Sequence, residues 1–175
     1  MNQAIENMKT RRSVRKFKAD AVPQLIGQVI AAGPFAASGH DRQPWAVIAV
    51  TDEDVRRRLS QVNASFFDMD VKDPFYGAPV VIIVLVKKRT PTYLYDGTLC
   101  IGNMMLAAHS LGLASCWIHR ARQTFELPEW QEWLAGVGLD MTEEWEGVGH
   151  VALGYAAGDL PVARPRKEGR VFYVK

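Results

Sequence analysis

Apolar side chains recur every three to four residues near the start of the chain, which is the spacing of one helix face. This pattern predicts helices over residues 2–10 and 22–37. In the second segment the recurring apolar positions are Val22, Leu25, Ile26, Val29 and Ile30. Pro23 falls in the first turn of that segment, where a missing backbone N–H is tolerated, so the proline is compatible with the helix.

Two further helices are predicted on the surface of the protein. Residues 51–59 begin with Thr51 as the candidate N-cap, and the acidic residues that follow complement the helix dipole. Residues 127–134 place Pro128 in the first turn, which is a favoured position for proline.

The segment 96–111 predicts a helix of a different kind, because it is small or apolar on nearly every face. One face carries Ile101, Met105, Ala108 and Leu111. Gly112 follows at the position where a left-handed residue commonly ends a helix. We expect this helix to be buried, either in the core or in a subunit interface.

Four apolar runs predict the strands of a sheet. They cover residues 44–50, 78–86, 114–118 and 149–156. The run 78–86 is apolar without interruption, which is typical of a central strand covered on both faces. The sheet core is therefore expected at this strand.

Residues 157–175 form a polar, proline-containing arm that ends in the β-rich tip "VFYV". Phe172 and Tyr173 in this tip need a partner surface to bury them. No linker or internal repeat divides the chain, so we expect one domain over residues 1–175. Helices interleaved with buried strands predict an α+β or α/β layered sheet.

Composition excludes several classes of protein. The chain has 175 residues, 48% of them hydrophobic, which suffices for one sizeable core. Its formal net charge is +2 at neutral pH, which argues against a dedicated nucleic-acid binder. Cys100 and Cys116 lie too far apart for a CxxC site and are expected to be reduced, buried thiols. Without an apolar signal core or a long apolar span, we expect a cytoplasmic protein with no membrane partner.

Several common motifs are absent from the sequence. There is no GxxxxGK[ST], and "GVGHVALG" lacks the GxGxxG spacing, so neither a P-loop nor a Rossmann fingerprint is predicted. "GLASCW" is not a GxSxG nucleophile elbow. The four histidines show no HExxH spacing, and we expect no metal site.

A basic run, "TRRSVRKFKAD" at residues 10–20, is the first candidate for a binding site. In an extended segment the alternating positions Arg11, Ser13 and Arg15 would lie on one side and could grip a phosphate. The alternative is a solvated basic face, which is what most short basic runs are.

A second basic cluster, "ARPRK", repeats the alternating spacing at Arg164 and Arg166, and Pro165 favours the extended form. A phosphate monoester carries nearly two negative charges, and two or three guanidinium groups are its natural complement. The two clusters could therefore meet on one dianion.

Together, "RRSVRKF", "QPW", "LGLASCWI" and "RPRK" in this order resemble the FMN-dependent nitroreductase family from about residue 8 to the C-terminus. The resemblance implies a three-layer α+β fold with a mostly antiparallel sheet flanked by helices. It also implies an obligate homodimer in which residues 157–175 are exchanged between subunits, with one FMN at each of two interface sites.

The resemblance assigns the phosphate of FMN to both basic clusters. Arg11 and Ser13 would hold it with help from Arg12. A second pair, Arg164 and Arg166, would reach it from the C-terminal arm. None of these residues is expected to act as a catalytic acid.

Around the flavin ring the resemblance implies three further contacts. Arg15 falls where the family has a cation near the pyrimidine edge. The loop residues Ser38, Gly39, Asp41 and Gln43 would approach the ring from the partner subunit. The backbone of Trp117, Ile118 and His119 would lie along the ring near N5 and O4.

The function implied is a ping-pong oxidoreductase. FMN would accept a hydride from NADH or NADPH and pass electrons to a small acceptor such as an aromatic nitro compound, a quinone or an enone. A non-enzymatic FMN-binding protein that senses or stores the cofactor would need the same contacts. A dimeric nucleic-acid-binding module is the third alternative, and it predicts strongly salt-dependent affinity. The motifs do not discriminate between the two donors or among the acceptors.

Two features depart from the usual pattern of the family. Asp41 stands where many relatives have asparagine, and an ionised carboxylate can only accept hydrogen bonds. We expect it either to turn toward Arg42 or to lower the flavin potential. In the segment 63–77, the rings of Phe66, Phe67, Phe75 and Tyr76 could line the acceptor pocket or simply pack in the core.

Overall fold

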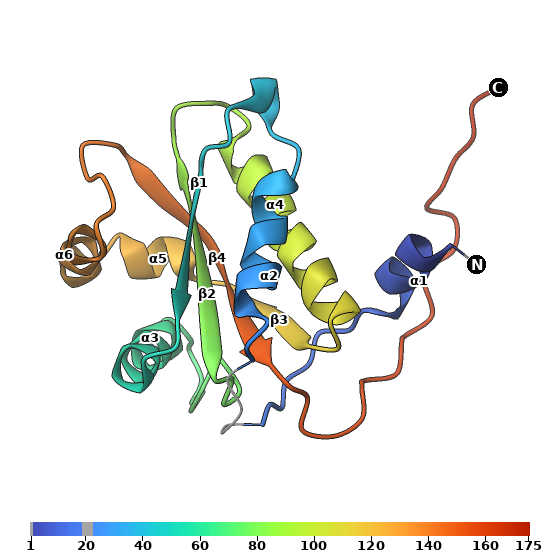
Figure 1. Cartoon of the computed structure of the whole chain (residues 1–175), viewed down its shortest axis with the longest axis horizontal. Helices are drawn as coiled ribbons and strands as arrows, with labels where there is room; N and C mark the ends of the chain where they lie inside the picture. Colours follow the sequence, from blue (N-terminus) through green and yellow to red (C-terminus); the bar gives the residue numbers. More distant parts are fainter. Residues whose placement is uncertain (1, 19–22) are drawn as a thin grey trace.

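Four antiparallel strands form the sheet in the part of the chain that the computed structural model describes, residues 2–18 and 23–175 (Figure 1). The strands are β1 (Trp45–Val50), β2 (Val80–Lys87), β3 (Ala114–Ile118) and β4 (Trp145–Gly154). Their order across the sheet is β1-β2-β4-β3, and each neighbouring pair is antiparallel. All four predicted strands are confirmed.

Strand β4 starts four residues before the predicted position, at Trp145 rather than residue 149. Its register with β2 shifts between Val84 and Leu85, and the ladder then continues to the pair Lys87 and Trp145. The glycines at 147 and 149 hide this extension in the sequence, because glycine is a poor strand former.

Strand β2 is buried along its length on both faces, as its apolar run predicts. Val80, Ile82, Val84 and Val86 enter one apolar cluster. Val81, Ile83 and Leu85 enter the other. The sheet therefore lies between two separate cores, and each core needs its own layer of helices.

On one face, α2 (Ile26–Ala32) and α4 (Tyr93–Ser110) cover the sheet, and α1 (Gln3–Thr10) packs against α4 (Figure 1). The helix predicted over 22–37 is shorter than expected, and Val22 lies outside the described residues. It ends at Ala32 and continues as a 3-10 turn through Gly33–Phe35, because Pro34 lacks the N–H that another α-helical turn would need.

Helix α4 is confirmed as a largely buried helix, although it begins at Tyr93 rather than residue 96. Gly112 follows it in the left-handed conformation, with φ of +74°. The N–H of Leu113 donates to the carbonyl oxygen of Ala108 at 2.8 Å, which completes the turn that stops the helix.

The other face is covered by α3 (Glu53–Ser65), α5 (Ala121–Phe125) and α6 (Pro128–Val137). The predicted N-cap of α3 at Thr51 is wrong. Asp52 caps the helix instead, and its carboxylate accepts from the N–H of Val55 at 2.8 Å. Helix α5 was not predicted, because five residues are too few to show a helical period. The α+β fold with an antiparallel sheet flanked by helices is confirmed.

Both cysteines are free and buried, as predicted. Burial raises the pKa of the Cys100 thiol to about 11, so it stays protonated at neutral pH. Within residues 2–18 and 23–175, no helix is both long and apolar enough to cross a membrane.

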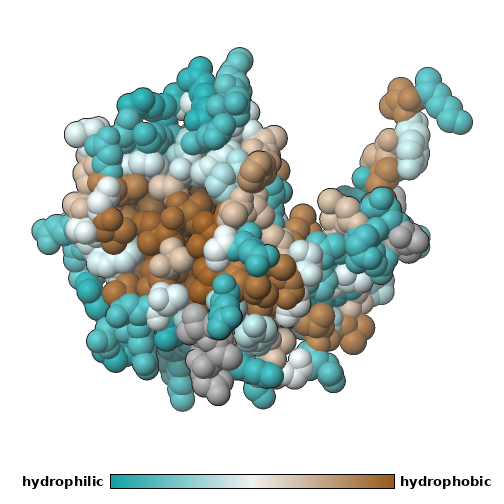
Figure 2. Space-filling model, in the orientation of Figure 1, coloured by the Kyte–Doolittle hydropathy of each residue, from teal (hydrophilic) through white to brown (hydrophobic). Residues whose placement is uncertain are grey.

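Residues 157–175 have no helix or strand in this chain, and they extend away from the body (Figures 1 and 2). Val171, Phe172 and Tyr173 are 73%, 82% and 86% exposed. The β-rich tip is therefore uncovered by its own chain, although large apolar groups favour burial.

His150, fully buried on β4 between the rings of Phe75 and Phe125, makes folding sensitive to acid. Burial lowers its pKa from 6.5 to about 4. In the unfolded chain this histidine is therefore protonated below about pH 6.5, whereas in the folded chain it stays neutral down to about pH 4. The free energy of unfolding falls as the pH drops through this window. We expect a loss of up to about 3 kcal/mol in the free energy of unfolding. Urea unfolding between pH 7 and 4 measures it, and in His150→Leu the corresponding part of the slope should disappear.

Candidate functional site

The basic segment 11–18 is extended and lies against the open edge of β3. Ser13 forms a parallel bridge with Ser115, and the N–H of Val14 donates to the carbonyl oxygen of Ser115 at 3.1 Å. Further along, Phe17 bridges Ala156. Val14 and Phe17 are buried in the core. These two anchors hold the intervening polar side chains at the surface, as the extended spacing predicts.

The structure brings the alternating residues Arg11, Ser13 and Arg15 together beside Cys116 on β3. Burial raises the pKa of the Cys116 thiol. The charges of Arg15 and Arg11, with a hydrogen bond from the Ser13 side chain, oppose that rise. The three side chains therefore act on one point of the sheet edge, and the potential there is positive.

Arg11 gives the clearest sign of an anion-binding site. Its Nη1 atom is buried and has no hydrogen-bond partner among the residues that the structure describes. A buried guanidinium N–H without an acceptor is costly, because it has lost water and gained nothing in return. A phosphate oxygen would supply the missing acceptor. The residues present therefore fit the phosphate of FMN.

Arg12 is used differently in this chain. Its Nη1 donates to the carbonyl oxygens of Lys9 and Arg11, both at 2.7 Å. These carbonyls end helix α1, where a cation complements the helix dipole. Arg12 thus fixes the turn from which Arg11 and Ser13 project, and its expected help at the phosphate would require it to leave these contacts.

The segment 117–120 is held from behind by α3 and α5. The side chain of Asn63, fully buried on α3, donates to the carbonyl oxygen of His119 at 2.8 Å. Thr124 donates its N–H and its hydroxyl to the carbonyl oxygen of Arg120, both at 3.0 Å. Arg120 has a left-handed φ of +78°. These bonds fix the backbone that is expected to border the flavin ring.

The side chains of this segment point in different directions. Trp117 is 38% exposed and packs on Gly149, where an added Cβ would lie 2.2 Å from the indole Nε1. Ile118 is buried. His119 is exposed. The Trp117 and His119 side chains are therefore accessible to solvent, whereas that of Ile118 is not.

The loop that carries Ser38, Gly39, Asp41 and Gln43 lies before β1, far from residues 11–18 in the chain's own fold (Figure 1). His40, Asp41 and Gln43 all have positive φ, at 54°, 54° and 46°. Such conformations persist only where the surroundings hold them, and they are frequent at functional sites.

Specific bonds hold this loop. The N–H of Gly39 donates to the buried carboxylate of Asp96 at 3.1 Å. The N–H of Gln43 donates to the Ser38 hydroxyl at 3.1 Å. Asp41 accepts a hydrogen bond from the Gln43 side-chain amide at 2.9 Å. It therefore turns toward Gln43 and not toward Arg42, which was one of the two expected alternatives. These bonds hold the loop in one conformation before β1.

Arg164 and Arg166 are exposed in the C-terminal arm. Within the described residues they form no ion pair. Their guanidinium groups therefore carry charges that no acidic side chain in the described part of the chain neutralises through an ion pair.

The aromatic residues of segment 63–77 divide between core and surface. Phe75 is 2% exposed and packs edge-on against His150, so it belongs to the core. Phe67 and Tyr76 are each 37% exposed. The Arg120 guanidinium lies 5.3 Å from the Phe67 ring centroid, which ties this segment to the backbone at 117–120.

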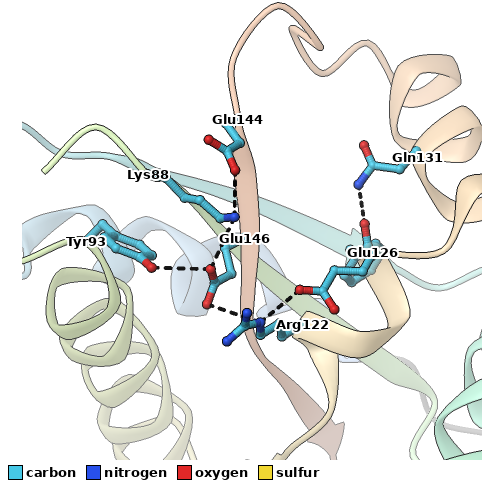
Figure 3. Close-up of polar contacts among 8 residues, drawn as sticks. Lys88, Tyr93, Arg122, Glu126, Gln131, Glu144 and Glu146 are labelled. Carbon is cyan, nitrogen blue, oxygen red and sulfur yellow. Dashed lines mark hydrogen bonds and ion pairs between the residues drawn. The ribbon is translucent and has the colours of Figure 1, made fainter. Parts of the chain in front are cut away.

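A charged cluster that sequence reasoning missed lies at the start of β4 (Figure 3). The carboxylate of Glu146 is buried, and it accepts a hydrogen bond from the Tyr93 hydroxyl at 3.3 Å. Lys88 Nζ lies 3.7 Å from it and Arg122 Nε 3.9 Å. The cluster ties α4, α5 and the turn after β2 to β4. Since α5 follows residues 117–120 directly, it also helps to place that segment.

Three comparisons relate the chain to known proteins. The sequence model described as the nitroreductase family matches residues 8–70 and 70–155. A crystal structure of a nitroreductase with bound FMN from Bacteroides fragilis is 31% identical, covers 100% of both chains and has a TM-score of 0.86. A Methanothermobacter thermautotrophicus protein with the provisional name NADH dehydrogenase/NAD(P)H nitroreductase is 32% identical over 139 residues, 71% of this chain and 70% of its own.

One further structure is similar in fold. It is a nitroreductase with bound FMN from Desulfitobacterium hafniense, 24% identical, with a TM-score of 0.86 and complete coverage of both chains. The described elements of this chain therefore superpose on two proteins of the same architecture.

Proposed function

The chain belongs to the nitroreductase family, and from this premise we propose that it takes a hydride from NAD(P)H and reduces a small aromatic nitro compound, a quinone or an enone by a ping-pong mechanism. Its place among NAD(P)H-dependent flavin oxidoreductases follows from the same similarities. FMN, when bound, supplies a ring that accepts a hydride and returns the electrons. The protein supplies binding, orientation and charge.

The observation that carries this proposal is the buried Nη1 of Arg11 without an acceptor, beside Ser13 and Arg15. In the proposal Arg11 and Ser13 bind the FMN phosphate. The backbone at 117–119, held by Asn63, borders the ring near N5 and O4. Arg15 lies at the pyrimidine edge. A rigid backbone edge on one side leaves the opposite ring face for the donor and the acceptor in turn.

The proposal includes a homodimer that completes each site. Large apolar side chains are exposed on α4 and on the turn after α2: Tyr95 is 72% exposed, Leu99 50% and Phe35 86%. Figure 2 shows a broad apolar area over α2 and β1. A contiguous apolar surface of this kind favours association. The loop 38–43 of one subunit would then cover the flavin of the other.

The C-terminal arm fits the same dimer. Strand β1 stands at one end of the strand order and pairs with β2 alone among the described strands. An unpaired edge accepts an added strand, and the tip 171–174 has the β-branched and aromatic residues of one. Exchange of the arms would bury Phe172 and Tyr173 and carry Arg164 and Arg166 to the partner subunit. The expected domain of residues 1–175 and the cytoplasmic location stay predictions.

Anaerobic titration of the FMN-loaded protein tests the function. We expect NADH, NADPH or both to bleach the flavin absorbance, and nitrofurazone or a quinone to restore it. Flavin that stays oxidised with both donors would contradict the enzymatic proposal and favour a protein that only binds the cofactor.

Arg15 gives a prediction about the potential of the bound flavin. A cation near the ring favours the reduced form, which carries more negative charge. Arg15→Ala should therefore lower the two-electron midpoint potential by on the order of 20 mV, equivalent to about 1 kcal/mol. Spectroelectrochemical titration measures the shift.

Lys16 is the matched control, because it is equally exposed but projects to the other side of the extended segment. Lys16→Ala should leave the potential nearly unchanged. If Arg15→Ala still binds FMN and its potential equals that of the unchanged chain, Arg15 does not act on the ring.

A further inference from the structure

A cationic hollow of about 260 Å³ lies immediately beside the loop 38–43. Its lining residues are Arg42, Gln43, Pro44, Lys87, Arg89 and Thr90. Three of these six side chains carry a positive charge, and the hollow joins the end of the loop to the end of β2.

The carboxylates in reach do not balance the three cations. Lys87 Nζ lies 3.4 Å from Glu143, and Arg89 pairs with the same carboxylate oxygen. Arg42 forms no ion pair within the described part of the chain. Asp140 is a second carboxylate whose charge acts on both Lys87 and Arg89. Two carboxylates thus serve two cations, and Arg42 has none. The lining of the hollow itself has three cations and no acid.

Lys88 lies between Lys87 and Arg89 in the sequence, but its ammonium group is paired within the charged cluster around Glu146 (Figure 3). It pairs with Glu144 at 2.7 Å and lies 3.7 Å from Glu146. The bond to Glu144 raises the pKa of Lys88. The cluster in Figure 3 has three carboxylates for its two cations, so Lys88 adds no free positive charge to the hollow.

In the proposed function, the hollow would lie next to the flavin ring that the loop 38–43 covers. Gln43 lines the hollow and also belongs to the loop that would cover the partner's flavin. A donor that stacks its nicotinamide on the ring and extends past this loop would bring its 2′-phosphate near Arg42 and Arg89, which are both exposed.

We propose that this hollow binds the 2′-phosphate of NADPH and so favours NADPH over NADH as the donor. The proposal rests on the proposed function. A 2′-phosphate is a monoester with nearly two negative charges, and arginine recognises it in other dinucleotide sites. NADH has a hydroxyl group at this position and gains nothing from the excess charge.

Binding of two nucleotide fragments to the FMN-loaded protein tests the proposal without turnover. The probes are adenosine 2′,5′-bisphosphate and adenosine 5′-monophosphate, which differ only in the 2′-phosphate, and calorimetry measures both. We expect the bisphosphate to bind at least about tenfold more tightly at low salt, with the difference shrinking as salt is added. Equal affinities would overturn the proposal.

Two variants and one control locate the effect. Arg42→Gln and Arg89→Gln should each remove most of the preference for the bisphosphate. Because Arg89 lies outside the loop 38–43, Arg89→Gln should also lower the ratio of kcat/KM for NADPH to that for NADH by about tenfold, with the NADH value unchanged. Arg57→Gln is the control, because Arg57 is an exposed arginine of α3 that pairs with Asp54. It should change neither ratio.

The outcomes separate this proposal from the proposed function. Equal losses with both donors in Arg89→Gln would show that Arg89 does not discriminate the 2′-phosphate, and would overturn the proposal. Flavin reduced by both donors without discrimination would overturn it and leave the oxidoreductase intact. If neither donor reduces the flavin, the proposed function fails, and tight bisphosphate binding would still support the anion site.

Discussion

Replacing Arg11 with alanine should raise the dissociation constant for FMN by on the order of 100-fold, equivalent to about 3 kcal/mol. The side chain holds a buried Nη1 without an acceptor in the described structure. In the FMN complex this atom would donate to a phosphate oxygen, and charge-assisted bonds of this kind contribute more than neutral ones. Quenching of flavin fluorescence, as FMN is added to protein stripped of cofactor, measures the constant.

Arg57→Ala is the control for this measurement. Arg57 lies on the exposed side of α3, and its only described ion pair is with Asp54 at 2.7 Å. It has no place near residues 11–15, so the FMN affinity should stay the same. If Arg11→Ala remains folded and binds FMN as tightly as the unchanged chain, Arg11 does not bind the FMN phosphate.

Gly147→Ala should destabilise the fold more than any other single added methyl group among the buried glycines of β4. A Cβ at this position would lie 2.5 Å from the backbone carbon and oxygen of Ala121 and 2.9 Å from the backbone nitrogen of Arg122. These are backbone atoms, so α5 must move as a unit to make room. Overpacking of this type costs about 1–3 kcal/mol.

The displacement of α5 has a second consequence. Helix α5 follows the segment 117–120, and Thr124 within it holds the carbonyl oxygen of Arg120. Gly147→Ala should therefore weaken FMN binding as well as lower the midpoint of urea unfolding. Arg122, whose guanidinium faces Glu146, would also be moved from its partner.

Gly27→Ala is the matched control. Nothing lies within 4 Å of a Cβ added to Gly27, which is an exposed position inside α2. Alanine is the better helix former there, so this variant should be more stable by about 0.5–1 kcal/mol. If Gly147→Ala behaves like Gly27→Ala, the contact between β4 and α5 is not as close as the structure has it.

The sequence allowed the sheet to be predicted because each strand contains a short apolar run. In β2 every residue from Val80 to Val86 is buried, so the run could be seen without knowing its neighbours. The end of α4 was equally predictable, because Gly112 adopts the positive φ that glycine permits.

Other features depend on contacts between residues distant in the chain. Asn63 is a polar residue at a buried position of α3, and that mismatch was the available signal for its bond to His119. Glu146 gave no such signal, because its partners come from the turn after β2, from α4 and from α5. The cap of α3 was misplaced by one residue, since Thr51 and Asp52 are both good N-caps.

The candidate site was predictable in part. The alternation of Arg11, Ser13 and Arg15 indicated one side of an extended segment, and the structure places them together. Their roles toward FMN came from the resemblance and stay predictions. The loop 38–43 and the arm 157–175 have no function that a single chain can show, because the proposal gives both of them to the partner subunit.

The absorbance spectrum of the purified protein, recorded after size-exclusion chromatography and again after reconstitution with FMN, tests the central claim most directly. The account predicts flavin bands that coelute with a dimer at close to one FMN per chain. A colourless protein that takes up no FMN would contradict it, and the acceptor for the buried Arg11 nitrogen would have to be a different anion.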